Sequence, residues 1–140
     1  MTPRYAICMA AVLLFGSAGC QDRTIGTVAG TITLDGKPLP DGSLVFAPTR
    51  AGAGRTNGGV ISGGRYELTS SVGVMRVAIN STAYVEPVNG KEAVDPENPL
   101  AGPYRERVPA RYNEKSELTV TVEPGMNEAN FDLHSDAGKR

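Results

Sequence analysis

Several residue types are scarce in this chain of 140 residues, and each shortage excludes a class of protein. Tryptophan is absent, there is one histidine, and the only cysteines are Cys8 and Cys20. A zinc or other transition-metal site depends mainly on Cys and His ligands in fixed geometry, and one histidine with two cysteines does not supply a set of about four. The formal net charge is −1, so the dense basic face that neutralises nucleic-acid phosphates is missing. We expect no metal, no cofactor and no nucleic-acid partner.

One long apolar run is present, at the N-terminus. Arg4 precedes the apolar stretch 5–15, and the small residues Gly16 to Gly19 lead to Cys20. This is the three-part layout of a secretory signal. The apolar run holds about eleven residues, whereas a membrane-spanning helix needs about twenty. We therefore expect residues 1–19 to be a cleaved signal peptide.

The end of this signal resembles the bacterial lipobox, in Ser17-Ala18-Gly19-Cys20. The last three residues match, while Ser17 stands where Leu, Val or Ile is usual. The resemblance implies that the thiol of Cys20 carries a diacylglyceryl group and anchors the mature chain to a membrane. Ordinary signal-peptidase cleavage after Ala18 remains the alternative. The residue after Cys20 is Gln21 and not the Asp of the sorting rule of enteric bacteria. By resemblance to that rule, we expect a cell-envelope location, with the outer membrane or periplasmic face favoured.

The remaining chain has room for one domain. Residues 20–140 form a stretch of typical single-domain length. Once Cys8 leaves with the signal, no pair remains for an intramolecular disulfide, so burial and sheet hydrogen bonds must stabilise the fold. We expect a short tether at 20–24, a β-sandwich domain at 25–134 and a disordered tail at 135–140.

Short apolar groups separated by turn residues predict strands throughout this domain. Glycine and proline account for 17 and 10 residues, and no stretch keeps helical spacing for long. Gly63-Gly64 between two alternating segments predicts a hairpin with a primed turn. The sequence predicts an all-β fold, a single antiparallel sandwich of about seven strands. A further turn is expected at 124–127. The expected strands are 25–34, 43–48, 60–62, 65–69, 74–79, 117–122 and 129–133.

The segment 81–108 is predicted to be a long loop. It holds four prolines, several charges and few apolar residues, and a loop of this length in a compact domain is usually functional or disordered. Its carboxylates are the minimum for a weak calcium site, but their spacing matches no known calcium loop, so solvated side chains are the favoured interpretation. These carboxylates are Glu86, Glu92, Asp95 and Glu97.

Several of these segments together resemble a known family. The run from Gly30 to Phe46, G-T-I-T-L-D-G-K-P-L-P-D-G-S-L-V-F, is similar to the opening of carboxypeptidase regulatory-like domains. Gly64-Arg65-Tyr66-Glu67-Leu68 is similar to the strand Gly-x-Tyr/Phe-x-Leu of that family, and 73–79 to the strand after it. The later run from Pro109 to Leu133 resembles small exported lipoproteins abundant in planctomycete bacteria. The resemblance implies a transthyretin-like (prealbumin-like), Greek-key sandwich without catalytic residues.

One cluster of side chains is a candidate ligand-binding patch. Aromatic rings and guanidinium groups lie close together in its sequence, and such a patch can stack on sugar rings and pair with carboxylates or phosphates. The alternative is a solvated loop with Tyr112 packing under the edge of the sandwich. The consecutive His134, Ser135 and Asp136 have the side chains of a hydrolase triad but lie in a polar tail, so no catalytic residue is expected. The patch consists of Tyr104, Arg105, Arg107, Arg111 and Tyr112.

Three functions follow as hypotheses, in decreasing order of support. The first is a membrane-anchored, noncatalytic module that binds another envelope protein through sheet edges or loops. The second is a glycan-binding module that uses the tyrosines and arginines of the patch. The third, an enzyme, would need an acid–base pair of perturbed pKa in a pocket, and the sequence offers no such pair.

Overall fold

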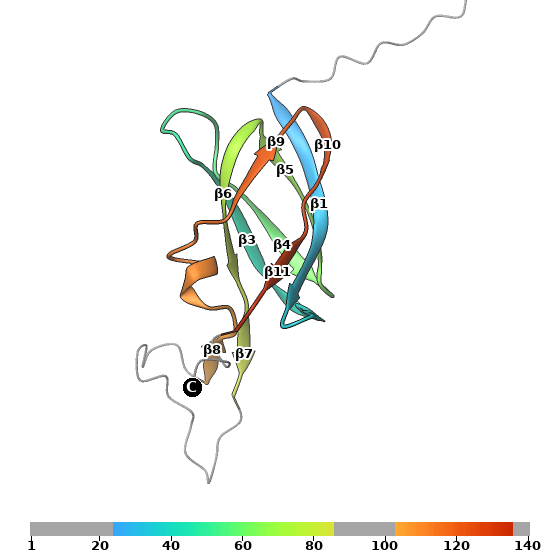
Figure 1. Cartoon of the computed structure of the whole chain (residues 1–140), viewed down its shortest axis with the longest axis vertical. Helices are drawn as coiled ribbons and strands as arrows, with labels where there is room; N and C mark the ends of the chain where they lie inside the picture. The colour runs from blue at the N-terminus through green and yellow to red at the C-terminus, as the bar shows by residue number, and fades with distance from the viewer. Residues whose placement is uncertain (1–23, 86–102, 136–140) are drawn as a thin grey trace, which may run out of the picture.

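A computed structural model describes residues 24–85 and 103–135, which form an all-β domain (Figure 1). The predicted signal peptide, Cys20, the calcium-site carboxylates and residues 136–140 lie outside these ranges. Within them there is one short 3-10 helix, η2 (Ala110–Tyr112). The strands are β1 (Ile25–Leu34), β2 (Lys37–Pro38), β3 (Asp41–Pro48), β4 (Asn57–Ser62), β5 (Arg65–Ser71), β6 (Gly73–Asn80), β7 (Thr82–Tyr84), β8 (Tyr104–Glu106), β9 (Thr119–Val122), β10 (Gly125–Glu128) and β11 (Phe131–Leu133).

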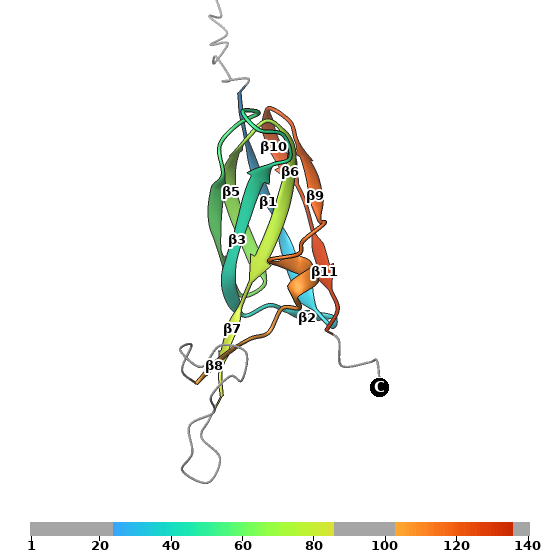
Figure 2. The same cartoon turned by 90° about the vertical axis from the view of Figure 1, so that its left-hand side faces the viewer.

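Nine strands form one curled sheet, and β7 pairs with β8 apart from it. The main order is β10-β1-β5-β4-β3-β6-β9, with β2 and β11 also paired to β1. The two end strands of this order are joined along the chain by Glu123 and Pro124 alone. The sheet therefore bends round until its ends meet, and Figures 1 and 2 show the resulting two layers.

The alternating pattern of the sequence places the strands as predicted in most of the chain. In β1, Val28 and Ile32 point into the core while Thr27 and Thr31 do not. The strand predicted at 74–79 is β6, and its buried face consists of Met75, Val77 and Ile79. This settles the choice of face that period-2 alternation alone leaves open, because either set of alternate residues satisfies the period.

The predicted hairpin is confirmed. Gly63 and Gly64 have φ of 57° and 76°, the left-handed conformation that both central residues of a type I′ turn require. Beyond this turn β4 and β5 separate, since Ser62↔Arg65 is their single paired position. β4 then continues along β3 and β5 along β1. The divergence of one hairpin thus divides the curled sheet into two layers.

A single apolar core fills the space between the layers. It includes both sides of the curl, and its largest completely buried side chain is Phe46. Tyr66 lies between Phe46 and Phe131, with ring centroids 6.4 and 6.1 Å away. Leu118 and Val120 are half-buried against it. The core residues are Val28, Ile32, Leu39, Leu44, Phe46, Ile61, Tyr66, Leu68, Met75, Val77, Ile79, Val108, Val122, Phe131 and Leu133.

Three expectations need correction. Pairing is antiparallel in most of the sheet, but β10 and β11 run parallel to β1, because β9 ends beside the start of β1 and the chain then descends along it. The turn predicted at 124–127 is wrong, since 125–128 is strand β10. The segment 81–108 is not wholly a loop, because β7 and β8 pair within it. The structure thus has more strands than the seven expected.

The domain has two opposite ends, which we name by the segments found there. At the N-terminal end β1 begins, the loop 49–56 joins β3 to β4, and β9 passes into β10. At the ribbon end lie the two-stranded ribbon β7–β8 and the last described residue, Ser135 (Figures 1 and 2). In both views the ribbon extends beyond the sheet, away from the start of β1.

Candidate functional site

The five residues predicted as a ligand-binding patch belong to two different sets of contacts at the ribbon end. Tyr104 and Arg105 lie in β8, and Arg107 follows it directly. Arg111 and Tyr112 lie in η2. The structure therefore separates the predicted patch into a ribbon group and a helix group, and only the first presents aromatic rings to solvent.

The ribbon group is built on a tyrosine pair. In the ribbon Tyr84 is directly opposite Tyr104, and their ring centroids lie 5.7 Å apart with an interplanar angle of 70°. This edge-to-face arrangement is favoured by the quadrupoles of the two rings. Tyr84 is 54% and Tyr104 50% exposed, so the pair combines mutual packing with open ring surface.

Arg105 does not extend this aromatic surface. It is opposite Ala83, one residue from the tyrosine pair on each strand. Because successive side chains of a strand point to opposite faces, Arg105 lies on the other face of the ribbon from Tyr84 and Tyr104. The predicted combination of Tyr104 and Arg105 against one ligand is therefore not formed within the ribbon itself.

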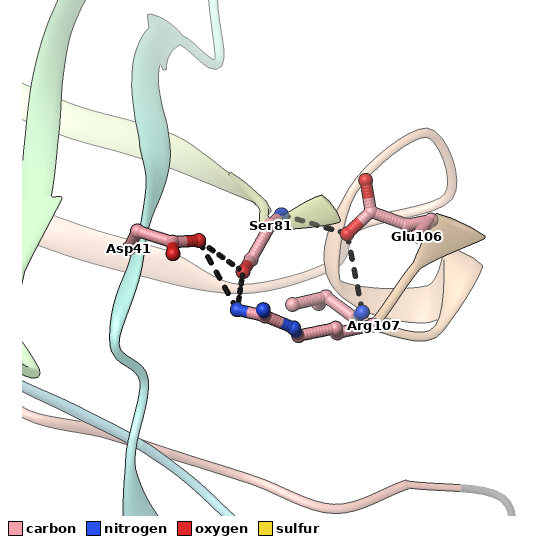
Figure 3. A network of polar contacts seen from close by, with 5 residues as sticks. Asp41, Ser81, Glu106 and Arg107 are labelled. Carbon is pink, nitrogen blue, oxygen red and sulfur yellow. Dashed lines mark hydrogen bonds and ion pairs between the residues drawn. The ribbon is translucent and has the colours of Figure 1, made fainter. Parts of the chain in front are cut away.

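Arg107 fixes the base of the ribbon to the sheet (Figure 3). Its guanidinium Nη1 donates to Asp41 Oδ1 at 3.1 Å and to Ser81 Oγ at 3.3 Å, and its backbone N–H donates to the Ser81 carbonyl at 2.7 Å. Ser81 is buried, whereas the side chains of Arg107 and Asp41 are 30% and 66% exposed. Arg107 is thus used in holding β3, β6 and β8 together.

Glu106 completes this polar network from the other side. Its Oε1 accepts hydrogen bonds from the backbone N–H groups of Ser81, at 2.7 Å, and Val108, at 3.1 Å (Figure 3). Hydrogen bonds to an ionised acceptor are stronger than neutral ones. The carboxylate therefore clamps both places where the chain enters and leaves the ribbon.

The helix group holds the end of β11. Tyr112 is half-buried against the core, as the alternative interpretation of the sequence expected, and its hydroxyl accepts the backbone N–H of His134 at 3.3 Å. The Arg111 guanidinium lies 4.8 Å from the Tyr112 ring centroid and donates to the His134 carbonyl. These contacts make Arg111 and Tyr112 structural residues.

The same region orders Ser135, the first residue of the expected tail. Its backbone N–H donates to Asp35 Oδ1 at 2.9 Å. The hydrogen bonds from the side chain and backbone of Ser135 lower the pKa of Asp35, and the charges of His134 and Arg111 act in the same direction. Asp35 has a φ of 52°, a left-handed conformation that Asp and Asn adopt more readily than most residues.

Four residues that form contacts at the ribbon end are missing from the predicted patch: Asp41, Ser81, Tyr84 and Glu106. Tyr84 becomes a neighbour of Tyr104 only because two three-residue strands pair although they are far apart in sequence, and no local pattern signals that pairing. Asp41 gives no local signal of its role, because its partner Arg107 is 66 positions away. Ser81 and Glu106 give no sequence signal, because a buried serine and an N–H-binding glutamate look like ordinary loop residues.

A second surface feature is a groove of about 850 Å³ across the outer face of β10, β1 and β5. Its floor is made of small residues of β1, and its rims carry the exposed side chains of Val60 and Met126. Tyr66 also borders the groove, although its ring lies in the core, and its hydroxyl donates to the Ala129 carbonyl at 2.7 Å. Burial raises the pKa of Tyr66 well above its ordinary value, so this phenol stays protonated and structural.

Within 24–85 and 103–135 no three His, Cys, Asp or Glu side chains converge in a way that could hold a metal ion. In the same ranges no helix has the length and apolar character to cross a membrane.

Comparisons with known proteins supply no family for the chain. No family model matches it, and no curated protein matches it. Among solved structures, a DUF3823 family protein from Parabacteroides merdae is similar at 14% sequence identity and a TM-score of 0.43. The alignment covers 80% of this chain and 47% of that protein, so this chain spans about half of that protein's length.

Proposed function

We propose that this protein is a noncatalytic interaction module of the bacterial cell envelope, anchored to a membrane through a lipid on Cys20, and that it binds another envelope protein through the ribbon end. The observation that carries this proposal is the exposed pair Tyr84 and Tyr104 at the end of the domain opposite the start of β1. An anchor at Cys20 would leave the ribbon pointing away from the bilayer, where a partner can reach it.

The rigid mounting of the tyrosine pair supports a binding role. The side chains of Arg107 and Glu106 bind both strands of the ribbon at its base, so the rings are held in place before any partner arrives. Pre-organised aromatic side chains lose little conformational entropy on binding, and tyrosine is enriched among the residues that contribute most to interfaces.

The finer fold assignment is also a proposal: a carboxypeptidase regulatory-like domain with a transthyretin-like, Greek-key sandwich. It is supported by where the resembling residues fall, since Gly30 to Phe46 spans most of β1, the turn after it and β3. The main sheet order gives a further argument, because the weak β4–β5 pairing divides it into β10-β1-β5 and β4-β3-β6-β9. These seven strands are the two layers that such a sandwich requires.

Site-specific crosslinking in the producing bacterium tests the interaction. A photoreactive amino acid at Tyr84 or Tyr104 is expected to give one discrete adduct with an envelope protein. The same amino acid at Val60, which is 74% exposed but lies on β4, is the matched control and is expected to give none. The interaction through the ribbon is refuted if all three positions give the same products or if none gives any.

Mass analysis of the mature N-terminus tests the anchor separately. The expected product begins at Cys20 with a thioether-linked diacylglyceryl group and partitions with membranes, and Cys20→Ala abolishes both. A mature chain that begins at Gly19 with a free thiol would contradict the anchor while leaving the crosslinking result meaningful.

Glycan binding is a second candidate, favoured by the open ring faces of the same tyrosine pair. Aromatic faces stack on sugar rings, and Asp41 and Thr82 near the base of the ribbon could add hydrogen bonds. The double substitution Tyr84→Ala/Tyr104→Ala is expected to lower cosedimentation with insoluble envelope polysaccharide at least tenfold, whereas Tyr112→Phe is expected to leave it unchanged. Retained binding by the double variant excludes this candidate.

A further inference from the structure

Exposed aliphatic side chains gather at the N-terminal end of the domain. The described chain has six large apolar residues that are exposed, and two of them are the ribbon tyrosines. Three of the other four are Ile25, Val74 and Met126, which are 44%, 49% and 77% exposed. Each is the first or second residue of its strand, in β1, β6 and β10 respectively, and all three strands begin at this end. The placement leaves Val60 as the single large aliphatic residue that is exposed elsewhere in the described chain.

These three side chains surround the end and do not line one face. Ile25 and Met126 lie on the outer face of the β1–β10 layer, where Gly26 is paired with Gly125. Val74 lies on the outer face of the other layer, where its neighbour Gly73 is paired with Val122. A rigid protein groove would contact one of these faces, whereas a fluid lipid surface can accommodate side chains around the whole rim.

The charges at this end favour an anionic surface. Arg50 and Arg55 are exposed in the loop 49–56, while Glu123 is the single acidic residue among the described turns at this end. Neither arginine forms an ion pair within the described ranges. The loop is held against the sheet, since Arg55 N–H donates to Ser71 Oγ at 3.0 Å and Thr49 N–H to the Val74 carbonyl at 3.2 Å. Arginines near a bilayer are attracted to anionic headgroups.

The distance to the proposed anchor is short. Cys20 precedes Ile25 by five residues, which span at most about 17 Å when fully extended. A lipid on Cys20 therefore keeps the N-terminal end within reach of the headgroups. We propose that this end, through Ile25, Val74, Met126, Arg50 and Arg55, rests on the surface of an anionic bilayer. This inference rests on the proposed lipid anchor, which would bring the domain to the membrane. Contact of the N-terminal end with the bilayer would then orient the ribbon outward.

Thiol accessibility in membranes tests this contact on the anchored protein. Single substitutions Val74→Cys and Met126→Cys are labelled with a membrane-impermeant maleimide in opened membrane fragments and again after detergent extraction. We expect labelling in membranes to be at least threefold slower than in detergent at both positions. Val60→Cys is the matched control and is expected to label at the same rate in both. Equal ratios at all three positions would overturn the proposal.

Vesicle binding tests the surface without the anchor, so that the two proposals can fail separately. Every core residue of the described chain lies between Val28 and Leu133, so a chain of residues 20–140 with Cys20→Ser retains the fold. We expect it to cosediment with vesicles of equal parts phosphatidylglycerol and phosphatidylcholine at low salt, and not with phosphatidylcholine alone. Arg50→Glu/Arg55→Glu is expected to reduce the bound fraction at least fivefold, and Arg65→Glu, on an exposed residue near the ribbon end, to leave it nearly unchanged.

The outcomes of the two experiments are distinct. Absence of binding to the anionic vesicles, or an equal loss with Arg65→Glu, refutes the membrane-contact surface whether or not Cys20 is acylated. A natural chain recovered in the soluble fraction refutes the anchor, and the vesicle result then decides the surface alone.

Discussion

The N-terminal end and the ribbon end are held by different kinds of interaction. At the N-terminal end the β1–β10 junction is held by close backbone approach at Gly26 and by the side chain of Asn127, which bonds to backbone groups of Thr27, Glu123 and Gly125. At the ribbon end the chain is held by side chains, in a network of Asp41, Ser81, Glu106 and Arg107 and in the contacts of Arg111 and Tyr112 with β11. The first end thus uses backbone groups and neutral side chains, whereas the second uses charged side chains together with a close approach of its own, Gly42 against the Asn80 carbonyl.

This difference matches the roles that we propose for the two ends. The contacts that hold the N-terminal end use backbone groups and neutral side chains such as Asn127 and Ser71, so its exposed aliphatic residues and two arginines can face a lipid surface. Directed hydrogen bonds place an exposed aromatic pair in one orientation, which suits recognition of a specific partner. Substitutions should therefore act globally at the first end and locally at the second.

The largest effect is expected from Gly26→Ala at the N-terminal end. A Cβ on Gly26 would lie 2.1 Å from the Glu123 carbonyl oxygen and 2.9 Å from a methyl carbon of Val122. Backbone cannot move aside as a flexible side chain can, so β10 would be pushed off β1. We expect a loss of about 3 kcal/mol in the free energy of unfolding, the upper part of the range for overpacking, measured by urea denaturation.

Gly58→Ala is the matched control for this change. Its added Cβ would meet only the Leu44 carbonyl oxygen, at an ordinary 3.7 Å. Removing a glycine from a strand interior reduces the entropy lost on folding, so the stability should stay the same or rise by about 0.5 kcal/mol. An equal loss in both variants would show that the N-terminal end is not fixed by close backbone approach.

A smaller, local effect is expected from Glu106→Gln at the ribbon end. The amide oxygen of glutamine can still accept a backbone N–H, but it lacks the charge that strengthens both bonds. We expect about 1 kcal/mol less protection, seen as roughly five- to tenfold faster hydrogen exchange at the Ser81 and Val108 amides. Exchange in the first half of β1 should not change. Glu114→Gln, on an exposed glutamate outside the network, should leave both amides as they were; faster exchange throughout the sheet would contradict a local role.

Elements that depend on local sequence are predicted well at both ends, and elements that depend on distant pairing are not. Period-2 alternation and paired glycines identify β1, β6 and the β4–β5 hairpin, because each depends on residues close in sequence. The pattern fails for β10, where Pro124-Gly125 has the composition of a turn but Gly26 allows the chain to lie against β1. Parallel pairing between β1 and β10 joins residues about a hundred positions apart, and no local signal reports it.

The candidate site follows the same rule. The sequence places Tyr104 in the candidate patch and offers packing of Tyr112 as an alternative; in the structure Tyr104 is exposed and Tyr112 is half-buried. It groups Arg107 and Arg111 with them because they are near in sequence, yet both guanidinium groups bind residues from distant strands. Proximity along the chain therefore overestimates a binding patch wherever its charged members have structural partners.

The smallest effect is expected from Asp35→Asn at the ribbon end, where the Asp35 carboxylate accepts the backbone N–H of Ser135. The hydrogen bonds of Ser135 hold the pKa of the Asp35 carboxyl below its ordinary value of 3.8. A lowered pKa in the folded state means that the ionised form contributes stability above pH 3.8, and that this contribution is lost as the pH falls through the folded value. Asparagine also adopts a positive φ, so the substitution removes the charge without straining the backbone.

Thermal unfolding at pH 6 is expected to show a lower Tm for Asp35→Asn than for the natural chain, and the difference in Tm should close as the pH falls below 3.8. Ser135→Ala, which keeps the backbone N–H and loses the hydroxyl, should give an intermediate gap at pH 6. A gap that does not depend on pH would mean that the last described residue is held by backbone geometry, as at the N-terminal end, and not by the charge of Asp35.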